Sequence, residues 1–353
     1  MTTVVGFVGL GNIGKPMALR LAAQQQSADL DVWVYDVAPE PLEEARSAGA
    51  NIATSVAAMA ARSDVLCVMV RDDAQVREVL GEVLGVAGDR LRDPAGRERL
   101  LRAAPRAPRR VATARRATSM PSRPRLARHP ADATLATASL PAGSLTVLIH
   151  STVAPTTPGE LADTAATHGV TVLDAPVSGG AMGAADGTLA LMVGGTEEGF
   201  AAARPVLDAL GSKVVHAGPI GAGTRFKLAR NMLHFISFTA ATEAQRLAEA
   251  AGLDLRELGD VVRHTDAITG GAGAIMHRET TAPLAPDDFW SGVFANVTSL
   301  GVKDLGFALE LAEELGVEVP LAELAIDRLG PGLGLPAETA GGTRGRAADD
   351  EEE

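Results

Sequence analysis

Three glycines near the beginning of the chain have the spacing of a nucleotide-binding turn. The stretch from Gly9 to Gly14 reads G-x-G-x-x-G, follows an apolar strand-like run and opens a helical pattern. In this context the first glycine makes a tight turn, the second lets the backbone approach a pyrophosphate, and the third lets helix and strand pack closely. The free N–H groups at the helix start then bind the phosphates. The motif predicts a dinucleotide site formed by Gly9, Leu10, Gly11, Asn12, Ile13 and Gly14.

An acidic residue follows at the distance that such a site requires. Asp36 ends the next strand-like run, 22 positions after Gly14. Its carboxylate can accept hydrogen bonds from the adenosine ribose hydroxyls and would repel a 2′-phosphate. The next two residues, Val37 and Ala38, offer no cation to a phosphate. We therefore expect NAD as the cofactor, with NADP the less favoured alternative.

Lysine is rare in this chain, so each lysine is a candidate for chemistry. The four lysines are Lys15, Lys213, Lys227 and Lys303, against 28 arginines. An amine can lose its proton near neutral pH when its surroundings favour the neutral form, whereas a guanidinium cannot. A lysine retained in such a chain is therefore a candidate for proton transfer.

Strands and helices alternate over the first 220 residues. Strand-like runs cover 4–8, 31–35, 65–70, 145–149, 170–173, 189–193 and 213–216, and helical patterns cover 15–26, 41–48 and 56–62. This alternation predicts an α/β domain with a doubly wound, Rossmann-type parallel sheet over residues 1–220.

The pattern becomes helical after about residue 221. Helical periodicity covers 224–251, 255–265, 303–315 and 320–329. We expect an all-helical C-terminal domain over residues 221–335 that starts with a long interdomain helix. Residues 336–353 end in a run of acidic residues and are expected to form a disordered tail.

Composition excludes several classes of protein. The net charge is −12, and outside residues 90–128, which carry +11, it is −12 − 11 = −23. An acidic body does not suit nucleic acid. No apolar stretch approaches 18 residues, and the chain starts without a basic leader, so we expect a cytoplasmic protein with no membrane partner. The single cysteine, Cys67, and the lack of metal-ligand spacing predict no metal site.

One segment departs from the α/β pattern. Residues 99–131 contain 10 Arg, 8 Ala and 5 Pro and no acidic residue. We expect a disordered insertion at about 89–139 with no catalytic role. A basic arm for nucleic acid or an acidic partner, and the product of a shifted reading frame, remain alternatives.

Five stretches, in order, resemble the β-hydroxyacid dehydrogenases, a group that includes 3-hydroxyisobutyrate dehydrogenase and tartronate semialdehyde reductase. They are Gly6–Ala18, Ser151–Pro155, Asp174–Gly180, Gly221–Asn231 and Lys303–Leu305. The resemblance covers about residues 1–88 and 140–330. It implies NAD(P)-dependent hydride transfer to or from a short 3-hydroxy acid by a homo-oligomer, a dimer or a tetramer.

The resemblance also implies residue roles. Lys227 would be the general acid/base that exchanges a proton with the substrate hydroxyl. Asn231, four residues later on the same helix face, would bind the substrate. The remaining substrate contacts would be Ser178, Gly179 and Gly180, and further cofactor contacts would be Met69, Val70, Thr152 and Lys303. His150, which precedes the Ser151 loop, is expected to be structural.

Three other functions remain open. An imine reductase shares this architecture, although such enzymes usually lack a lysine at the position of Lys227. A decarboxylating dehydrogenase of the 6-phosphogluconate type should offer more cations to a sugar phosphate. A non-catalytic NAD-binding protein would have no need of Lys227, Asn231 and Ser178.

Overall fold

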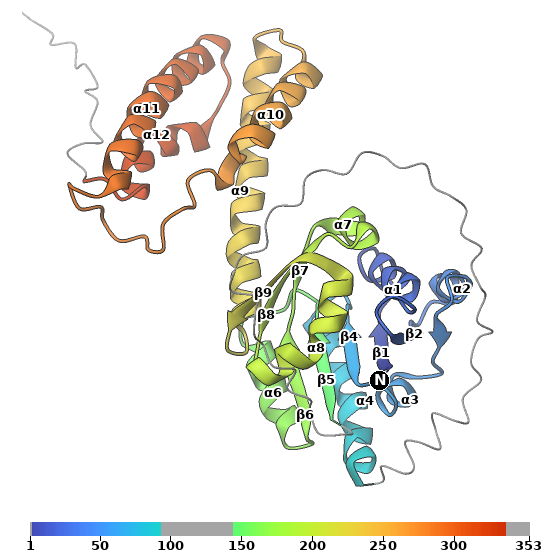
Figure 1. The fold of residues 1–353 in the computed structure, drawn as a ribbon. Helices are drawn as coiled ribbons and strands as arrows, with labels where there is room; N and C mark the ends of the chain where they lie inside the picture. Colours follow the sequence, from blue (N-terminus) through green and yellow to red (C-terminus); the bar gives the residue numbers. More distant parts are fainter. Residues whose placement is uncertain (1, 93–143, 337–353) are drawn as a thin grey trace, which may run out of the picture. The chain divides into compact units, whose positions relative to one another are not determined.

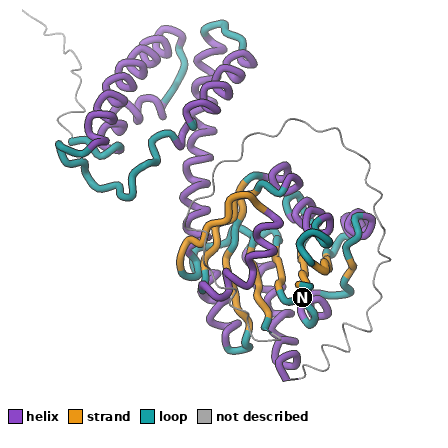
Figure 2. The backbone as a smooth tube through the Cα atoms, in the orientation of Figure 1, coloured by secondary structure: helices purple, strands orange, loops and turns teal. Residues whose placement is uncertain are grey.

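A computed structural model of the protein describes residues 2–92 and 144–336 (Figures 1 and 2). The chain forms two compact units, one ending at Ala229 and the other beginning at Arg230. The division falls within a single helix, α9 (Ala222–Ala250). The domain boundary expected from the sequence, at residues 220 and 221, lies just before this helix begins.

The first unit is built on a nine-stranded sheet. Its strands are β1 (Thr3–Val8), β2 (Leu30–Tyr35), β3 (Asn51–Ile52), β4 (Val65–Val68), β5 (Leu145–Ile149), β6 (Val170–Asp174), β7 (Val177–Ser178), β8 (Leu189–Gly194) and β9 (Gly211–Gly218). The order is β3-β2-β1-β4-β5-β6-β8-β7, with β9 paired to β8. All neighbouring pairs from β3 to β6 are parallel, which confirms the Rossmann-type α/β fold.

The far edge of the sheet is mixed rather than parallel. Strand β8 runs antiparallel to both β6 and β7, whereas β9 is parallel to β8. The chain goes from β7 to β8 through one short helix, α7 (Gly180–Asp186). A connection this short suits an antiparallel return, because a parallel crossover needs a dozen or more residues.

Helices cover both faces of the sheet (Figure 1). One face carries α1 (Gly14–Ala23), α2 (Pro39–Ser47), α7 and α8 (Glu197–Leu210), and the other carries α3 (Val56–Ala60), α4 (Asp73–Arg92) and α6 (Thr157–Ala166). Alternate residues of β1 enter the two cores: Val5 and Phe7 pack in the first, Val4 and Val8 in the second. A strand buried on both faces in this way is typical of a doubly wound sheet.

Helix α4 continues into the segment that the sequence sets apart. It ends at Arg92, so residues 89–92 are helical. The rest of that segment, residues 93–139, and the expected tail at 337–353 lie outside the described residues.

The second unit consists of the C-terminal part of α9 with α10 (Leu255–Thr269), α11 (Phe289–Leu315) and α12 (Pro320–Gly332). The buried Glu243 of α9 accepts hydrogen bonds from the backbone N–H groups of Leu321 and Ala322, and so caps the start of α12. Across residues 2–92 and 144–336, no helix has the length and apolar character to cross a membrane.

His150 is buried in the core at the end of β5. Its Nδ1 lies 2.8 Å from the carbonyl oxygen of Ala175, and its ring stacks on Phe7. Because a carbonyl can only accept, Nδ1 carries a hydrogen and donates this bond. Burial lowers the pKa of His150 from its usual 6.5 to about 4, although the hydrogen bond to Ala175 acts in the opposite direction. These contacts agree with the structural role expected for this residue.

We predict that His150 makes the sheet unit acid-sensitive. Between pH 6.5 and 4 the unfolded chain binds a proton at this residue that the folded chain does not, so the free energy of unfolding should fall as pH decreases. The loss should reach roughly 3 kcal/mol at pH 4. Urea unfolding, followed by Trp33 fluorescence in a Trp290→Phe background, should show this loss diminished in His150→Gln. The same pH dependence in His150→Gln and in the surface variant His168→Gln would contradict the prediction.

Candidate active site

Apart from Lys303, the predicted cofactor residues lie at the carboxyl ends of the parallel strands. Strands β1, β2, β4 and β5 are parallel, so their carboxyl ends lie together. The glycine motif follows β1, Asp36 follows β2, Met69 and Val70 follow β4, and Thr152 follows β5. The strand order reverses between β1 and β4, which is where folds of this class bind their ligands.

The glycine motif has the conformation of a phosphate-binding turn. Gly9 has φ +91°, and a Cβ there would lie 2.2 Å from the carbonyl oxygen of Met69. A Cβ at Gly14 would lie 2.0 Å from the carbonyl oxygen of Gly9, whereas Gly11 faces open space. Within the described residues, the N–H groups of Asn12, Ile13 and Gly14 have no acceptor. These groups fit a pyrophosphate, because they are free donors at the positive end of the α1 dipole.

Asp36 is hydrogen-bonded to the glycine turn. Its Oδ2 accepts a hydrogen bond from the N–H of Leu10 at 2.5 Å, and its Oδ1 accepts one from Ala38 at 2.8 Å. A carboxylate has about four acceptor positions, so both oxygens can still accept from ribose hydroxyls. The side chain of Val37 is 91% exposed and places no cation beside them.

The loop after β5 is fixed by two side chains. Ser151 Oγ donates to the carbonyl of Val70 at 2.8 Å and accepts from the N–H of the same residue at 2.9 Å. Asp73, at the start of α4, accepts from the Ala154 N–H and from the Thr157 hydroxyl. These bonds hold the ends of β4 and β5 together, while Thr152 between them is exposed. Asp73 was missed from the sequence; an acidic residue in the first turn of a helix was the available signal.

Lys227 and Ser178 meet in the first unit. Lys227 is only 9% exposed, and its Nζ donates a hydrogen bond to Ser178 Oγ at 3.2 Å. Ser178 lies on β7 and Lys227 in the second turn of α9, 49 residues later. The structure therefore brings together the predicted acid/base and a predicted substrate contact.

The remaining predicted substrate residues lie close in the sequence to Ser178 or to Lys227. Gly179 and Gly180 follow Ser178 with φ of +131° and +66°, and a Cβ on Gly180 would meet no atom within 4 Å. Both glycines are exposed, so a ligand can approach them from solvent. Asn231 lies four residues after Lys227 on α9, where its side-chain oxygen accepts from Arg230 at 3.5 Å.

Lys303 belongs to the second unit. It lies on α11, where its Nζ is 2.9 Å from Asp304 Oδ1 and 5.9 Å from the centre of the Phe307 ring. Its expected contact with the cofactor stays a prediction.

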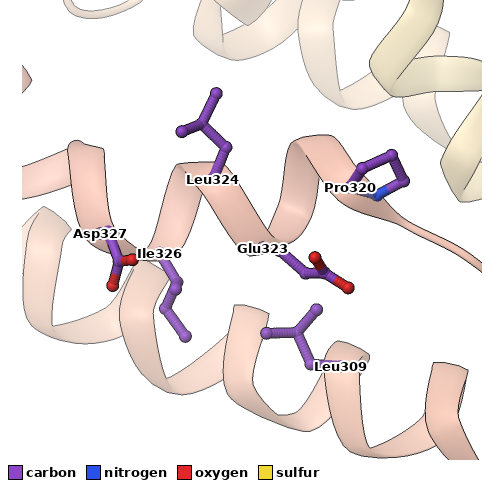
Figure 3. A pocket seen from close by; sticks show the side chains of 6 residues that line it. All are labelled: Leu309, Pro320, Glu323, Leu324, Ile326 and Asp327. Carbon is purple, nitrogen blue, oxygen red and sulfur yellow. The ribbon is translucent and has the colours of Figure 1, made fainter.

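A surface hollow of about 440 Å³ lies between α11 and α12 (Figure 3). Its lining residues are Leu309, Pro320, Glu323, Leu324, Ile326 and Asp327. None of the predicted site residues lines this hollow, and it carries two carboxylates where an anionic substrate would need donors. In the part of the chain that the structure describes, no cluster of His, Cys, Asp and Glu side chains could hold a metal ion.

Two family models match consecutive parts of the chain. The first, the NAD binding domain of 6-phosphogluconate dehydrogenase, matches residues 4–92 and 105–218. The second, the NAD-binding domain of NADP-dependent 3-hydroxyisobutyrate dehydrogenase, matches residues 221–329. Together they cover both units.

Relatives match over nearly the whole chain. An uncharacterised oxidoreductase from Mycobacterium tuberculosis is 42% identical over 95% of each chain. A probable 3-hydroxyisobutyrate dehydrogenase from Mycobacterium bovis is 32% identical over 92% of this chain and 90% of its own. The crystal structure of a Mycobacterium avium protein named only as an oxidoreductase is 41% identical and has a TM-score of 0.75, covering 94% of this chain and 99% of its own.

Asp36, at the end of the second strand, predicts that the protein binds NADH more tightly than NADPH. Replacing Asp36 by Ser and Val37 by Arg removes a repelling carboxylate and adds a partner for a 2′-phosphate. A hydrogen bond between charged groups contributes about 1.5–3 kcal/mol, so the NADPH/NADH affinity ratio should rise about tenfold or more. Nicotinamide fluorescence titrations measure both affinities without a substrate. Val37→Arg alone, which keeps the carboxylate, should shift the ratio less. Tighter binding of NADPH than of NADH by the unmodified protein would contradict this reading of Asp36.

Proposed function

Because this chain belongs to the 3-hydroxyisobutyrate dehydrogenase family of NAD-binding oxidoreductases, we propose that it transfers hydride between NAD and a short 3-hydroxy acid, with Lys227 as general acid/base. The observation that carries the proposal is the hydrogen bond between the buried Lys227 and Ser178. It joins a group suited to proton transfer with the start of the glycine loop suited to a carboxylate.

Lys227 exchanges the hydroxyl proton in this proposal. In the oxidation its neutral amine takes the proton from the substrate hydroxyl, and in the reduction its ammonium donates the proton to the carbonyl oxygen. Arginine cannot replace this lysine, because a guanidinium stays protonated.

The substrate carboxylate binds the loop that follows β7. Ser178 offers a hydroxyl, and the exposed residues Gly179 and Gly180 offer backbone N–H groups. Asn231 adds an amide that can bind either substrate oxygen without adding charge. We expect a short acid because Gly179 and Gly180 directly follow Ser178 in the chain and Asn231 lies four residues after Lys227.

The cofactor residues suit a pyrophosphate and an unphosphorylated ribose. The glycine turn and the free N–H groups of Asn12, Ile13 and Gly14 bind the phosphates, and Asp36 binds the ribose. When bound, the nicotinamide supplies the hydride acceptor or donor.

Removing the amine tests the proposal. Lys227→Ala should lower kcat/KM by about 10²- to 10⁴-fold, because the proton has no acceptor in the transition state. NADH affinity, measured by fluorescence, should stay near that of the unmodified enzyme. Lys227→Arg should not restore turnover, and the exposed Lys213→Ala is the matched control that should leave it intact. A panel of hydroxy acids and cyclic imines, assayed with NAD(H) and NADP(H), identifies the reaction. A Lys227→Arg enzyme with nearly unchanged kcat would exclude the assignment.

A second copy of the chain completes the helical unit in this proposal. None of residues 228–242 of α9 is buried. The exposed residues include large apolar side chains: Met232, Phe235, Ile236 and Phe238 are all more than half exposed. Helix α10 has no buried residue either, and it exposes the apolar side chains of Val261 and Ile268. A helix that is apolar on several sides is normally buried. A second copy presents the same apolar helices and can cover them in a symmetric, self-complementary interface.

Charges on this apolar surface should separate the copies. Light scattering coupled to gel filtration should give a dimer or a larger even-numbered assembly for the unmodified protein. Phe235→Glu with Phe238→Glu should shift it to the monomer, because two buried carboxylates would each lose their hydration. Thr167→Glu, on the exposed end of α6, should leave the assembly unchanged. A monomeric unmodified protein at micromolar concentration would contradict the oligomer.

A further inference from the structure

One buried carboxylate joins the sheet to the helix that carries Lys227. Asp174, the last residue of β6, has no exposed surface. Its Oδ1 accepts a hydrogen bond from the N–H of Gly221 at 2.7 Å, and its Oδ2 accepts one from the N–H of Thr224 at 2.6 Å. Both donors belong to the first turn of α9 or to the residue just before it. Among the described residues, Asp174 makes no salt bridge, so these N–H groups are its partners.

The sheet and the helix approach too closely at this point for side chains. A Cβ on Gly194, at the end of β8, would lie 2.3 Å from Asp174 Oδ1 and 2.9 Å from the N–H nitrogen of Ala222. A Cβ on Gly223 would lie 2.2 Å from the carbonyl oxygen of Met192. The glycines therefore allow α9 to start directly against β8, and Asp174 supplies the hydrogen bonds that hold it there.

The same contact determines where Lys227 lies. Thr224 precedes Lys227 by three residues, less than one helical turn, so fixing its N–H fixes the direction of the lysine stem. Ser178, the partner of Lys227, is paired to Ala190 of β8 in the same sheet. The positions of both Lys227 and Ser178 therefore depend on the same part of the sheet, the end of β6 and the neighbouring β8.

We infer that Asp174 is a positioning residue: its carboxylate anchors the first turn of α9 and thereby holds Lys227 Nζ within hydrogen-bond distance of Ser178. The inference rests on the proposed role of Lys227. A carboxylate is required because both oxygens accept from N–H groups, and the negative charge lies at the positive end of the helix dipole. An asparagine at this position can accept only one of the two bonds and presents an NH₂ group to the other donor.

Asp174→Asn tests the inference with almost no change in volume. We expect kcat to fall about 10- to 100-fold, since a misplacement of about 1 Å can have an effect of this size. The substrate KM should change less than kcat, and NADH affinity should be retained, because the glycine turn is untouched. Rates are referred to the concentration of NADH-binding sites, so that unfolded protein is not counted. Hydrogen–deuterium exchange of the peptide 219–228 should increase at the same time.

Two further variants keep the test specific. Gly194→Ala retains Asp174 but adds a methyl group that would overlap its carboxylate. This variant should therefore reproduce the fall in kcat and the faster exchange. Glu243→Gln is the matched control: Glu243 is also buried on α9 and also caps a helix start with both oxygens, but it caps α12 rather than the turn before Lys227. It should lose stability without losing kcat.

The outcomes separate this inference from the proposed function. An Asp174→Asn enzyme with kcat within about twofold of the unmodified enzyme overturns the inference, as does an equal fall of kcat in Glu243→Gln. Absence of turnover by the unmodified protein with every hydroxy acid overturns the proposed function instead. In that case unchanged exchange of peptide 219–228 in Asp174→Asn would still overturn the anchoring role, and faster exchange would support it.

Discussion

The turn after β1 leaves no room for a side chain at Gly9 or Gly14, and the arrangement of the sheet unit depends on this constraint. A Cβ on Gly9 would overlap the carbonyl of Met69, and a Cβ on Gly14 would overlap the carbonyl of Gly9. With glycine at both positions, the chain passes from β1 into α1 while the ends of β1 and β4 remain in contact. The strand order reverses at this pair, so the loops that follow four parallel strands face one common region.

Polar side chains accept hydrogen bonds from backbone N–H groups at the ends of strands and helices, where the regular backbone pairing stops. Asp36, Asp73, Ser151 and Asp174 each lie at a strand end or a helix start, and each bonds the N–H groups of another segment. Buried backbone groups must be paired, and these positions have no ladder or helix partner to supply the bond. The residues that stabilise the irregular ends are therefore also the ones that determine the geometry of the candidate site.

The two units differ in how much apolar surface they bury. The sheet unit has two extensive cores, one on each face, and its strands β1, β4, β5 and β6 are almost entirely buried. The helical unit has a core cluster of four buried residues, Leu284, Phe294, Leu333 and Leu335, and exposes large apolar side chains on α9, α10 and α11. The first unit has the properties of an independently stable domain. The second has those of a surface that is completed by association, in keeping with the oligomer proposed above.

The cofactor turn, the Rossmann-type sheet and the helical second half follow from the sequence alone, because each depends on local spacing. The glycine positions, the apolar runs of β1, β2, β4 and β5, and the long period of α9 are readable within windows of ten to thirty residues. Lys227 was identified by a motif within α9, and the structure places it beside Ser178, as the proposed chemistry requires. Helices α4, α6 and α8 were not among the predicted elements, although parallel strands need such crossovers.

Tertiary structure alone decided the antiparallel edge formed by β7 and β8, and the roles of Asp73 and Asp174. Asp174 meets Gly221 across 47 residues and Thr224 across 50, and Asp73 meets Ala154 across 81. No local pattern encodes which distant N–H group a carboxylate will bond. That choice is made when the sheet brings β6, β8 and the start of α9 within hydrogen-bond distance, and when glycine at 194 and 223 allows the close approach.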